Sequence, residues 1–174
     1  MLKSRKDLDR IREQAEKGMG RQRMRAMVCA GTGCLANGSL KVYERLRELV
    51  AEKGLLVDIA MTEDACGEGQ EAGGGIGVEK SGCHGFCQMG PLIRIEPQGI
   101  LYVSVKPEDA EEIVEETLIK GKPVTRLFYQ DPFKGTQVET EESIPFYKHQ
   151  HRVVLANCGR INPEDIREAI AMGG

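Results

Sequence analysis

The chain carries, from Ser81 to Pro91, the stretch SGCHGFCQMGP, in which Cys83 and Cys87 lie four positions apart among three glycines. A second glycine-containing stretch, AGTGCLANG, directly follows Cys29 and includes Cys34. Two such turns at one end of a sheet would bring four thiolates together, which is the composition of a zinc or iron-sulfur site. We therefore predict that the four cysteines form one metal centre.

The gaps inside the two pairs favour an iron-sulfur cluster over zinc. Zinc knuckles generally have two residues between paired cysteines, whereas these pairs enclose four and three residues, which suits a [2Fe-2S] cluster whose two irons each take two thiolates. Nearby glycines allow the backbone to approach the cluster, so that their N-H groups can point at sulfur. The glycines expected in this role are Gly31, Gly33, Gly85 and Gly90. Structural zinc, a thiol-disulfide exchange site and four unrelated buried thiols remain as alternatives.

Composition limits the class of protein. The chain has 174 residues and a net charge of −3. Of these residues 40% are hydrophobic, and this length and composition are enough for one domain with an appendage. It has neither an apolar run long enough to span a membrane nor the apolar middle of a signal peptide, so we expect a cytoplasmic protein with reduced thiols. The basic N-terminal residues are interspersed with acids and lack aromatic neighbours, which favours a solvated helix face over nucleic-acid binding.

Hydrophobic periodicity predicts alternating helices and strands. The expected fold class is α/β, a small mixed sheet flanked by helices over residues 25–121, preceded by an amphipathic helix over residues 1–24 that a Ser4–Asp7 capping box begins. The expected strands are Arg25–Val28, Leu55–Met61, Leu92–Glu96 and Leu101–Val105, with a helix around Val42–Val50 and another beginning at Pro107. The glycine-rich stretch Gly67–Gly77 has no GK[ST] ending and no helical pattern after it, so a surface loop is favoured over a phosphate-binding loop.

The C-terminal part has a different pattern. Residues 122–150 lack a sustained period and are expected to be a linker or an extended wrapping segment. After them, RVVLA predicts a strand, and Asn162 followed by Pro163 predicts the start of a helix. One strand and one helix cannot enclose a core, so residues 151–174 either pack on the first unit or begin a second domain that stops here. We expect the second arrangement.

Several of these stretches resemble a known family. VCAGTGCLANGS, SGCHGFCQMGPLIRIEP and ILYVSVKPEDAEEIVEETL resemble the thioredoxin-like [2Fe-2S] ferredoxin domain at the N-terminus of flavoprotein subunits of NAD(P)-dependent, electron-bifurcating [FeFe] hydrogenases and related formate dehydrogenases. The segment from Leu127 onward is similar to the entrance of the FMN- and NADH-binding domain that these subunits share with NADH:quinone oxidoreductase. The resemblance implies Cys29, Cys34, Cys83 and Cys87 as ligands of the cluster.

The resemblance also implies a function and partners. The chain would relay single electrons to or from a flavin domain and partner iron-sulfur subunits, with ferredoxin as a further partner. The sites for FMN, NAD and a [4Fe-4S] cluster would lie beyond Gly174, and no complete active site or catalytic residue is legible in this chain. The alternative function is a zinc-stabilised docking module without a redox role.

The remaining cysteines and histidines are expected to have other roles. Cys66 and Cys158 have no partner at ligand spacing, so we expect neither to bind the metal. His84 lies between two ligands, but four cysteines already suffice, so we expect it to donate a hydrogen bond or to face solvent. His149 and His151 are expected to be exposed.

Overall fold

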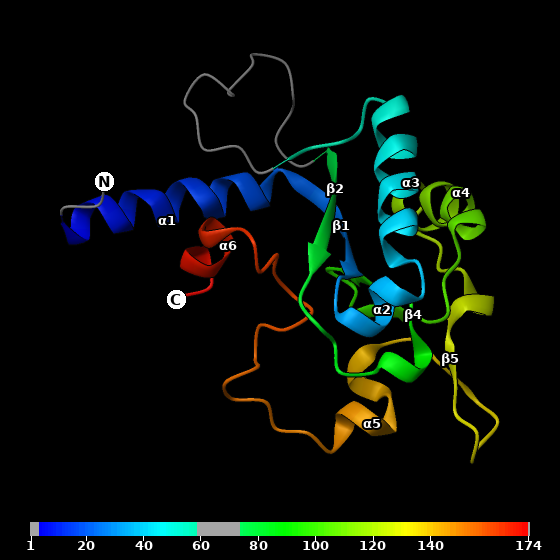
Figure 1. The fold of residues 1–174 in the computed structure, drawn as a ribbon. Helices are drawn as coiled ribbons and strands as arrows, with labels where there is room; N and C mark the ends of the chain where they lie inside the picture. Colours follow the sequence, from blue (N-terminus) through cyan, green and yellow to red (C-terminus); the bar gives the residue numbers. More distant parts are fainter. Residues whose placement is uncertain (1–3, 59–73, 174) are drawn as a thin grey trace.

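The fold is built on a four-stranded mixed sheet. The computed structural model describes residues 4–58 and 74–173, and the strand order in its main sheet is β2-β1-β3-β4 (Figure 1). The strands are β1 (Gln22–Cys29), β2 (Gly75–Ser81), β3 (Ile93–Glu96) and β4 (Ile100–Tyr102). β1 pairs in parallel with β2 and antiparallel with β3, and β3 and β4 form a hairpin. The predicted α/β class, a small mixed sheet flanked by helices, is confirmed.

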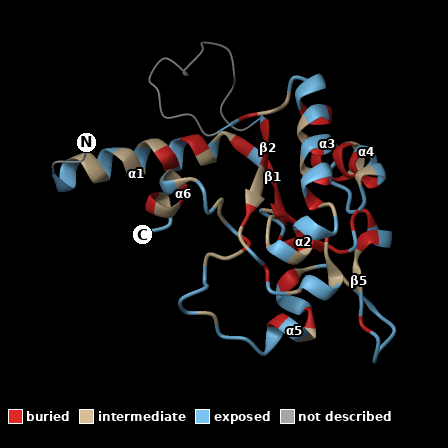
Figure 2. Ribbon diagram, in the orientation of Figure 1, coloured by how far each residue is buried: buried red, intermediate tan, exposed pale blue. Residues whose placement is uncertain are grey.

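One face of the sheet packs against two helices. These are α3 (Ser39–Glu52) and the helix that begins with a single turn at Pro107–Asp109, continues as α4 (Ala110–Glu112) and ends in π-helical turns at Ile113–Ile119. Leu46 of α3 and Ile113 pack with Ala26 of β1 in the main hydrophobic core. Figure 2 shows that the buried residues gather in the strands and on the sheet-facing sides of these helices.

The helix that precedes the sheet has the predicted capping box. The side chain of Ser4 accepts a hydrogen bond from the backbone of Asp7, and the Asp7 carboxylate accepts one from the Ser4 backbone, so both groups at the helix start are satisfied. This helix, α1 (Arg5–Gly20), runs directly into β1.

The strand that pairs in parallel with β1 begins in a stretch that the sequence predicts to be a loop. Leu55–Met61 was expected to be a strand, but residues 55–58 contribute only an isolated bridge between Leu56 and Ile76, and residues 59–61 lie outside the described part of the chain. β2 instead begins at Gly75, inside the stretch expected to be a loop. Two positions of this strand are glycines, because side chains from neighbouring segments occupy the space that a larger residue would need. A Cβ on Gly75 would lie 2.0 Å from Cγ2 of Val57.

The segment over residues 122–150 wraps around the sheet edge. It contains a small hairpin of β5 (Tyr129–Gln130) and β6 (Gln137–Val138), followed by α5 (Pro145–Lys148). Ile144 and Tyr147 of this segment are buried with Cys29 and Cys34 in a second hydrophobic cluster, so the segment covers the end of the sheet where the cysteines lie.

The last part of the chain lies against the N-terminal helix. The predicted strand at RVVLA is wrong: Val153 to Ala156 form a bend and turns, and Val153 and Val154 are 73% and 95% exposed. The predicted helix is present as α6 (Ile166–Ala171), although Asp165 caps it rather than Asn162. α6 packs against α1, so the two ends of the described chain lie on the same side of the molecule (Figure 1). The assignment of residues 151–174 to the opening of a second domain stays a prediction.

Candidate metal centre

The two cysteine pairs lie at one end of the sheet because two parallel strands lead into them. Cys29 is the last residue of β1, and Cys34 follows in the short helix α2 (Thr32–Ala36). β2 ends at Ser81, which is the register partner of Cys29, and Cys83 and Cys87 lie in the next turn. Parallel strands end at the same edge of a sheet, so both turns emerge there together.

The sulfur atoms interact within and between the pairs. Cys29 and Cys34 share a side-chain hydrogen bond, as do Cys83 and Cys87, and Cys29 acts electrostatically on Cys83. No disulfide forms among the cysteines that the structure describes, and in this part of the chain no three ligand-type side chains converge on one metal-ion position. The thiols are therefore arranged as two neighbouring pairs. Two thiolates for each of two irons is the ligand demand of a [2Fe-2S] cluster.

The two pairs differ in exposure. Cys29 and Cys34 are 1% and 0% exposed and belong to the second hydrophobic cluster, whereas Cys83 and Cys87 are exposed. A cluster bound between the pairs would have one buried side and one side facing solvent.

A shared hydrogen bond shifts the pKa values of the two buried cysteines in opposite directions. The hydrogen bond from the Cys34 thiol lowers the pKa of Cys29 to about 5, against the opposing effect of burial. The same hydrogen bond, with burial, raises the pKa of Cys34, because that thiol keeps its proton. The hydrogen bond therefore favours a thiolate on Cys29, and thiolate is the form that binds metal.

Backbone N-H groups surround the sulfurs, although not all the predicted ones. The N-H groups of Gly31 and His84 donate to Cys29, and the N-H of Gly85 donates to the sulfur of Cys83 at 3.3 Å. The N-H of Gly90 instead donates to the carbonyl oxygen of Cys87, at 3.1 Å. The role of the Gly33 N-H stays a prediction, and the backbone of Leu92 is a further donor, to Cys34.

Glycines also leave the space that the cysteines occupy. A Cβ on Gly31 would lie 2.9 Å from the sulfur of Cys83, and one on Gly90 would lie 2.7 Å from the sulfur of Cys34. A Cβ on Gly33 would lie 3.1 Å from the Cβ of Cys87. The absence of side chains at these positions lets the two turns approach each other.

His84 lies inside the protein, next to Cys83 in sequence. It is fully buried, so the alternative in which it faces solvent is wrong, and it shares a hydrogen bond of 2.9 Å with the Ser81 hydroxyl. Its Nδ1 lies 3.7 Å from the carboxylate of Glu141, which also pairs with Arg94. Burial opposes ionisation of Glu141, but the contacts with His84 and Arg94 hold its pKa below the ordinary value. The partner Glu141 comes from the wrapping segment and has no sequence signal linking it to the cysteines.

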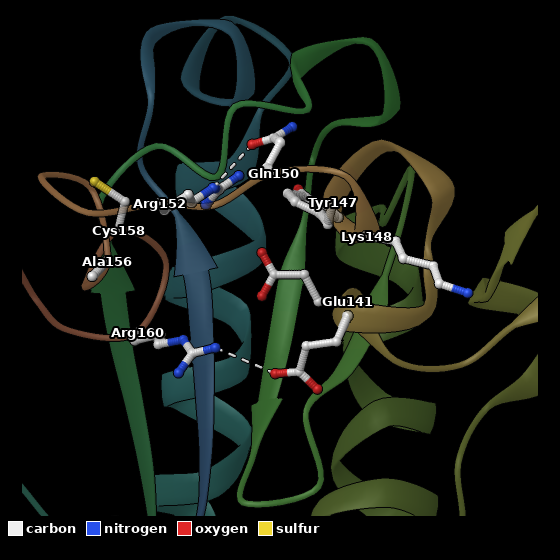
Figure 3. A pocket seen from close by; sticks show the side chains of 9 residues that line it. Glu141, Tyr147, Lys148, Gln150, Arg152, Ala156, Cys158 and Arg160 are labelled. Atoms are coloured by element: carbon white, nitrogen blue, oxygen red, sulfur yellow. Dashed lines mark hydrogen bonds and ion pairs between the residues drawn. The ribbon is translucent and has the colours of Figure 1, made fainter.

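The other sequence candidates lie apart from the sulfurs. His149 and His151 are exposed, in agreement with the sequence. Cys158 is half-buried in the wall of a cavity of about 390 Å³, whose lining includes Glu141, Tyr147 and Arg152 (Figure 3). Cys66 and most of the stretch 67–77 lie outside the described residues.

Comparison with known proteins relates the chain to ferredoxins. It is 48% identical over 50 residues to "Ferredoxin, 2Fe-2S" of Aquifex aeolicus (strain VF5) and 42% identical over 50 residues to "Ferredoxin, 2Fe-2S" of Clostridium pasteurianum. Each match covers 29% of this chain, and the chain spans 45% and 49% of these relatives' lengths, about half. No family model matches the chain.

Two solved structures match the chain with TM-scores below 0.5. A thioredoxin-like [2Fe-2S] ferredoxin from Aquifex aeolicus matches with a TM-score of 0.47 and 27% identity, over 61% of this chain and 89% of that one. A variant of that ferredoxin matches with a TM-score of 0.46 and 28% identity, over 60% of this chain and 95% of the other. Separately, no helix in the described part of the chain has the length and apolarity to cross a membrane.

Proposed function

We propose that this chain is a thioredoxin-like [2Fe-2S] ferredoxin domain that transfers single electrons. The observation that carries the proposal is the meeting of the Cys29–Cys34 and Cys83–Cys87 pairs at one sheet edge, in turns whose glycines leave room for sulfur. The N-H groups of Gly31 and Gly85 donate hydrogen bonds to these sulfurs. Such donors would stabilise the negative charge that a bound cluster gains on reduction. The identity to two [2Fe-2S] ferredoxins supports the same cofactor.

The donor set fits this cofactor. The four thiolates would hold the cluster, which supplies a one-electron redox couple when bound. The protein would set its potential through burial of the Cys29–Cys34 side and through N-H donors. Electrons would pass through the exposed side, where Cys83 and Cys87 lie near solvent and a partner can approach.

The wider assignment rests on the resemblance of the sequence. We propose that the chain belongs to the flavoprotein subunit of a cytoplasmic NAD(P)H-linked oxidoreductase of the hydrogenase or formate dehydrogenase type. The N-terminal helix would occupy residues 1–24 and the cluster domain residues 25–121. The linker would follow over residues 122–150, and the FMN- and NADH-binding domain would start at residues 151–174. The partners would be the remainder of that subunit, other iron-sulfur subunits and ferredoxin.

Metal and sulfide analysis tests the cofactor. Protein purified without oxygen should be reddish-brown, contain about two irons and two labile sulfides per chain, and give a rhombic electron paramagnetic resonance signal after reduction with dithionite. A colourless protein with one equivalent of zinc would instead select the docking module.

Single cysteine variants test the ligands. We expect Cys83→Ala to lose the iron and sulfide, because one iron would then lack a thiolate. Cys66→Ala and Cys158→Ala are the matched controls and should keep the wild-type visible spectrum. The reverse pattern would refute the ligand assignment.

A further inference from the structure

The C-terminal segment contacts the turn that carries Cys83. Arg152 lies far from this turn in sequence, yet its Nη2 atom donates a hydrogen bond of 2.8 Å to the backbone carbonyl oxygen of His84. A Cβ on Gly159, further along the same segment, would lie 2.7 Å from the ring of His84. The segment therefore packs directly on the residue that follows Cys83.

The carbonyl that accepts from Arg152 belongs to the same peptide group as an N-H that donates to sulfur. The His84–Gly85 peptide has its carbonyl oxygen on the guanidinium and its N-H on the sulfur of Cys83, at 3.3 Å. Hydrogen bonds in series polarise one another, and a charged donor strengthens the bond it makes. A cation on the carbonyl therefore makes the Gly85 N-H a stronger donor to Cys83.

Contacts on three sides hold Arg152 in this position. Its guanidinium lies over the ring of Tyr147, with 4.9 Å from Cζ to the ring centroid, and its Nε donates to Oε1 of Gln150 at 3.1 Å (Figure 3). Among the ion pairs of the described residues none includes Arg152, whereas Arg160 in the same cavity wall pairs with Glu142. The positive charge of Arg152 is thus not cancelled by a carboxylate contact.

We propose that Arg152 is a positioning residue of the metal centre that raises its reduction potential through the His84–Gly85 peptide. The inference rests on the proposed function, since it concerns the cluster held by Cys83. Reduction adds one electron to the cluster, and a positive charge and a stronger N-H donor next to a ligand sulfur both stabilise the added negative charge. The oxidised state gains less from the same contacts, so the equilibrium shifts toward reduction.

Redox titration of the 174-residue chain tests this role. Arg152→Gln removes the charge, and we expect the reduction equilibrium to shift about tenfold toward the oxidised cluster, which is about 59 mV for a one-electron couple. Arg152→Lys keeps a point charge without the planar fork and should give an intermediate potential. Arg160→Gln is the matched control: it removes another arginine from the same cavity wall and should leave the potential unchanged.

Vibrational spectroscopy gives a second readout. Resonance Raman spectra of the oxidised protein should show iron-sulfur stretching bands that shift in D₂O because of the N-H donor, and this isotope shift should shrink in Arg152→Gln. Equal potentials in wild type and Arg152→Gln, or equal falls in Arg152→Gln and Arg160→Gln, would overturn the proposal. If Arg152→Gln does not retain its cluster, a wild-type potential in Arg152→Lys together with an unchanged isotope shift would overturn it too. A wild-type chain that binds no [2Fe-2S] cluster would refute the proposed function itself, and this inference with it.

Discussion

Gly31 meets Cys83 more closely than a side chain would allow. Its own backbone is ordinary, with φ at −65°, so any residue could adopt it, but an added Cβ would lie 2.9 Å from both Cβ and Sγ of Cys83 and 3.2 Å from its Cα. Gly82, one residue before Cys83, has no atom within 4 Å of the corresponding position. Substituting each of the two glycines therefore distinguishes a steric clash with Cys83 from the general effect of replacing a glycine near the cysteines.

Gly31→Ala should reduce the iron and sulfide content of the purified protein severalfold, because the turn that carries Cys83 must move away to admit the methyl group. Gly82→Ala should retain the wild-type content. The measurement is iron and sulfide per chain after anaerobic reconstitution, with circular dichroism to establish that both variants are folded. Equal loading of the two variants would contradict the steric role of Gly31.

Single residues near the cysteines were only partly predictable. The spacing of the four cysteines suggested the two pairs because local turns fix the neighbours of each thiol. The burial of His84 was not predictable, since its surroundings come from Glu141, Arg152 and Gly159, which the tertiary fold brings from far along the chain. The Gly90 N-H was mispredicted for a local reason, because the turn directs it to the carbonyl of Cys87.

At the scale of elements, β2 carries a carboxylate with an unusual environment. Burial raises the pKa of Glu79 to about 7, and the charges of Glu168 and Asp58 add to the effect, while Arg25 and Arg47 oppose it. The native state therefore keeps the Glu79 proton to a higher pH than the unfolded chain, whose glutamates titrate near 4.5. The free energy of unfolding accordingly falls as the pH rises from 4.5 to 7.

Glu79→Gln should remove this loss, because glutamine stays neutral. We expect the variant to be more stable than wild type by on the order of 2 kcal/mol at pH 8 and nearly unchanged at pH 4, allowing for the partial exposure of the side chain. Urea unfolding followed by circular dichroism at the two pH values gives the difference. Glu111→Gln, at an exposed glutamate next to α4's first residue, is the control that should show no such pH dependence.

The elements themselves were predictable where a hydrophobic period was present. The helix at Val42–Val50, the strand at Arg25–Val28 and the β3–β4 hairpin follow from local pattern. β2 was missed because Gly75 and Gly77 resemble loop residues in sequence, whereas in the fold their missing side chains make room for Val57 and Gln22. That reason lies in tertiary packing and leaves no periodic signal.

At the scale of the whole molecule, one buried ion pair joins the two ends of the chain. Nη2 of Arg25 in β1 lies 2.8 Å from Oε2 of Glu168 in α6, and the two side chains are 9% and 1% exposed. The Glu168 carboxylate also accepts from the backbone N-H of Asn162 at 3.1 Å. Removing one charge of a buried pair leaves the other without compensation, which costs more than replacing both.

Glu168→Ala should therefore lower the free energy of unfolding by about 3 kcal/mol. The double variant Arg25→Met with Glu168→Leu should be much closer to wild type, since it buries no charge. Urea unfolding of wild type, Arg25→Met, Glu168→Leu and the double variant completes a cycle that measures the coupling. A coupling energy near zero would show that α6 does not hold to β1 through this pair.

The parallel register that places Ser81 beside Cys29 also dictates the order of maturation. A nascent chain that has emerged only as far as β1 and α2 offers two thiols and no complete binding set. The second two are in place only when β2 has paired with β1, and pairing strands that are distant in sequence is slow. Assembly of the proposed cluster would consequently come late in folding, and a slip of one residue between these two strands would displace one cysteine pair by about 3.3 Å against the other.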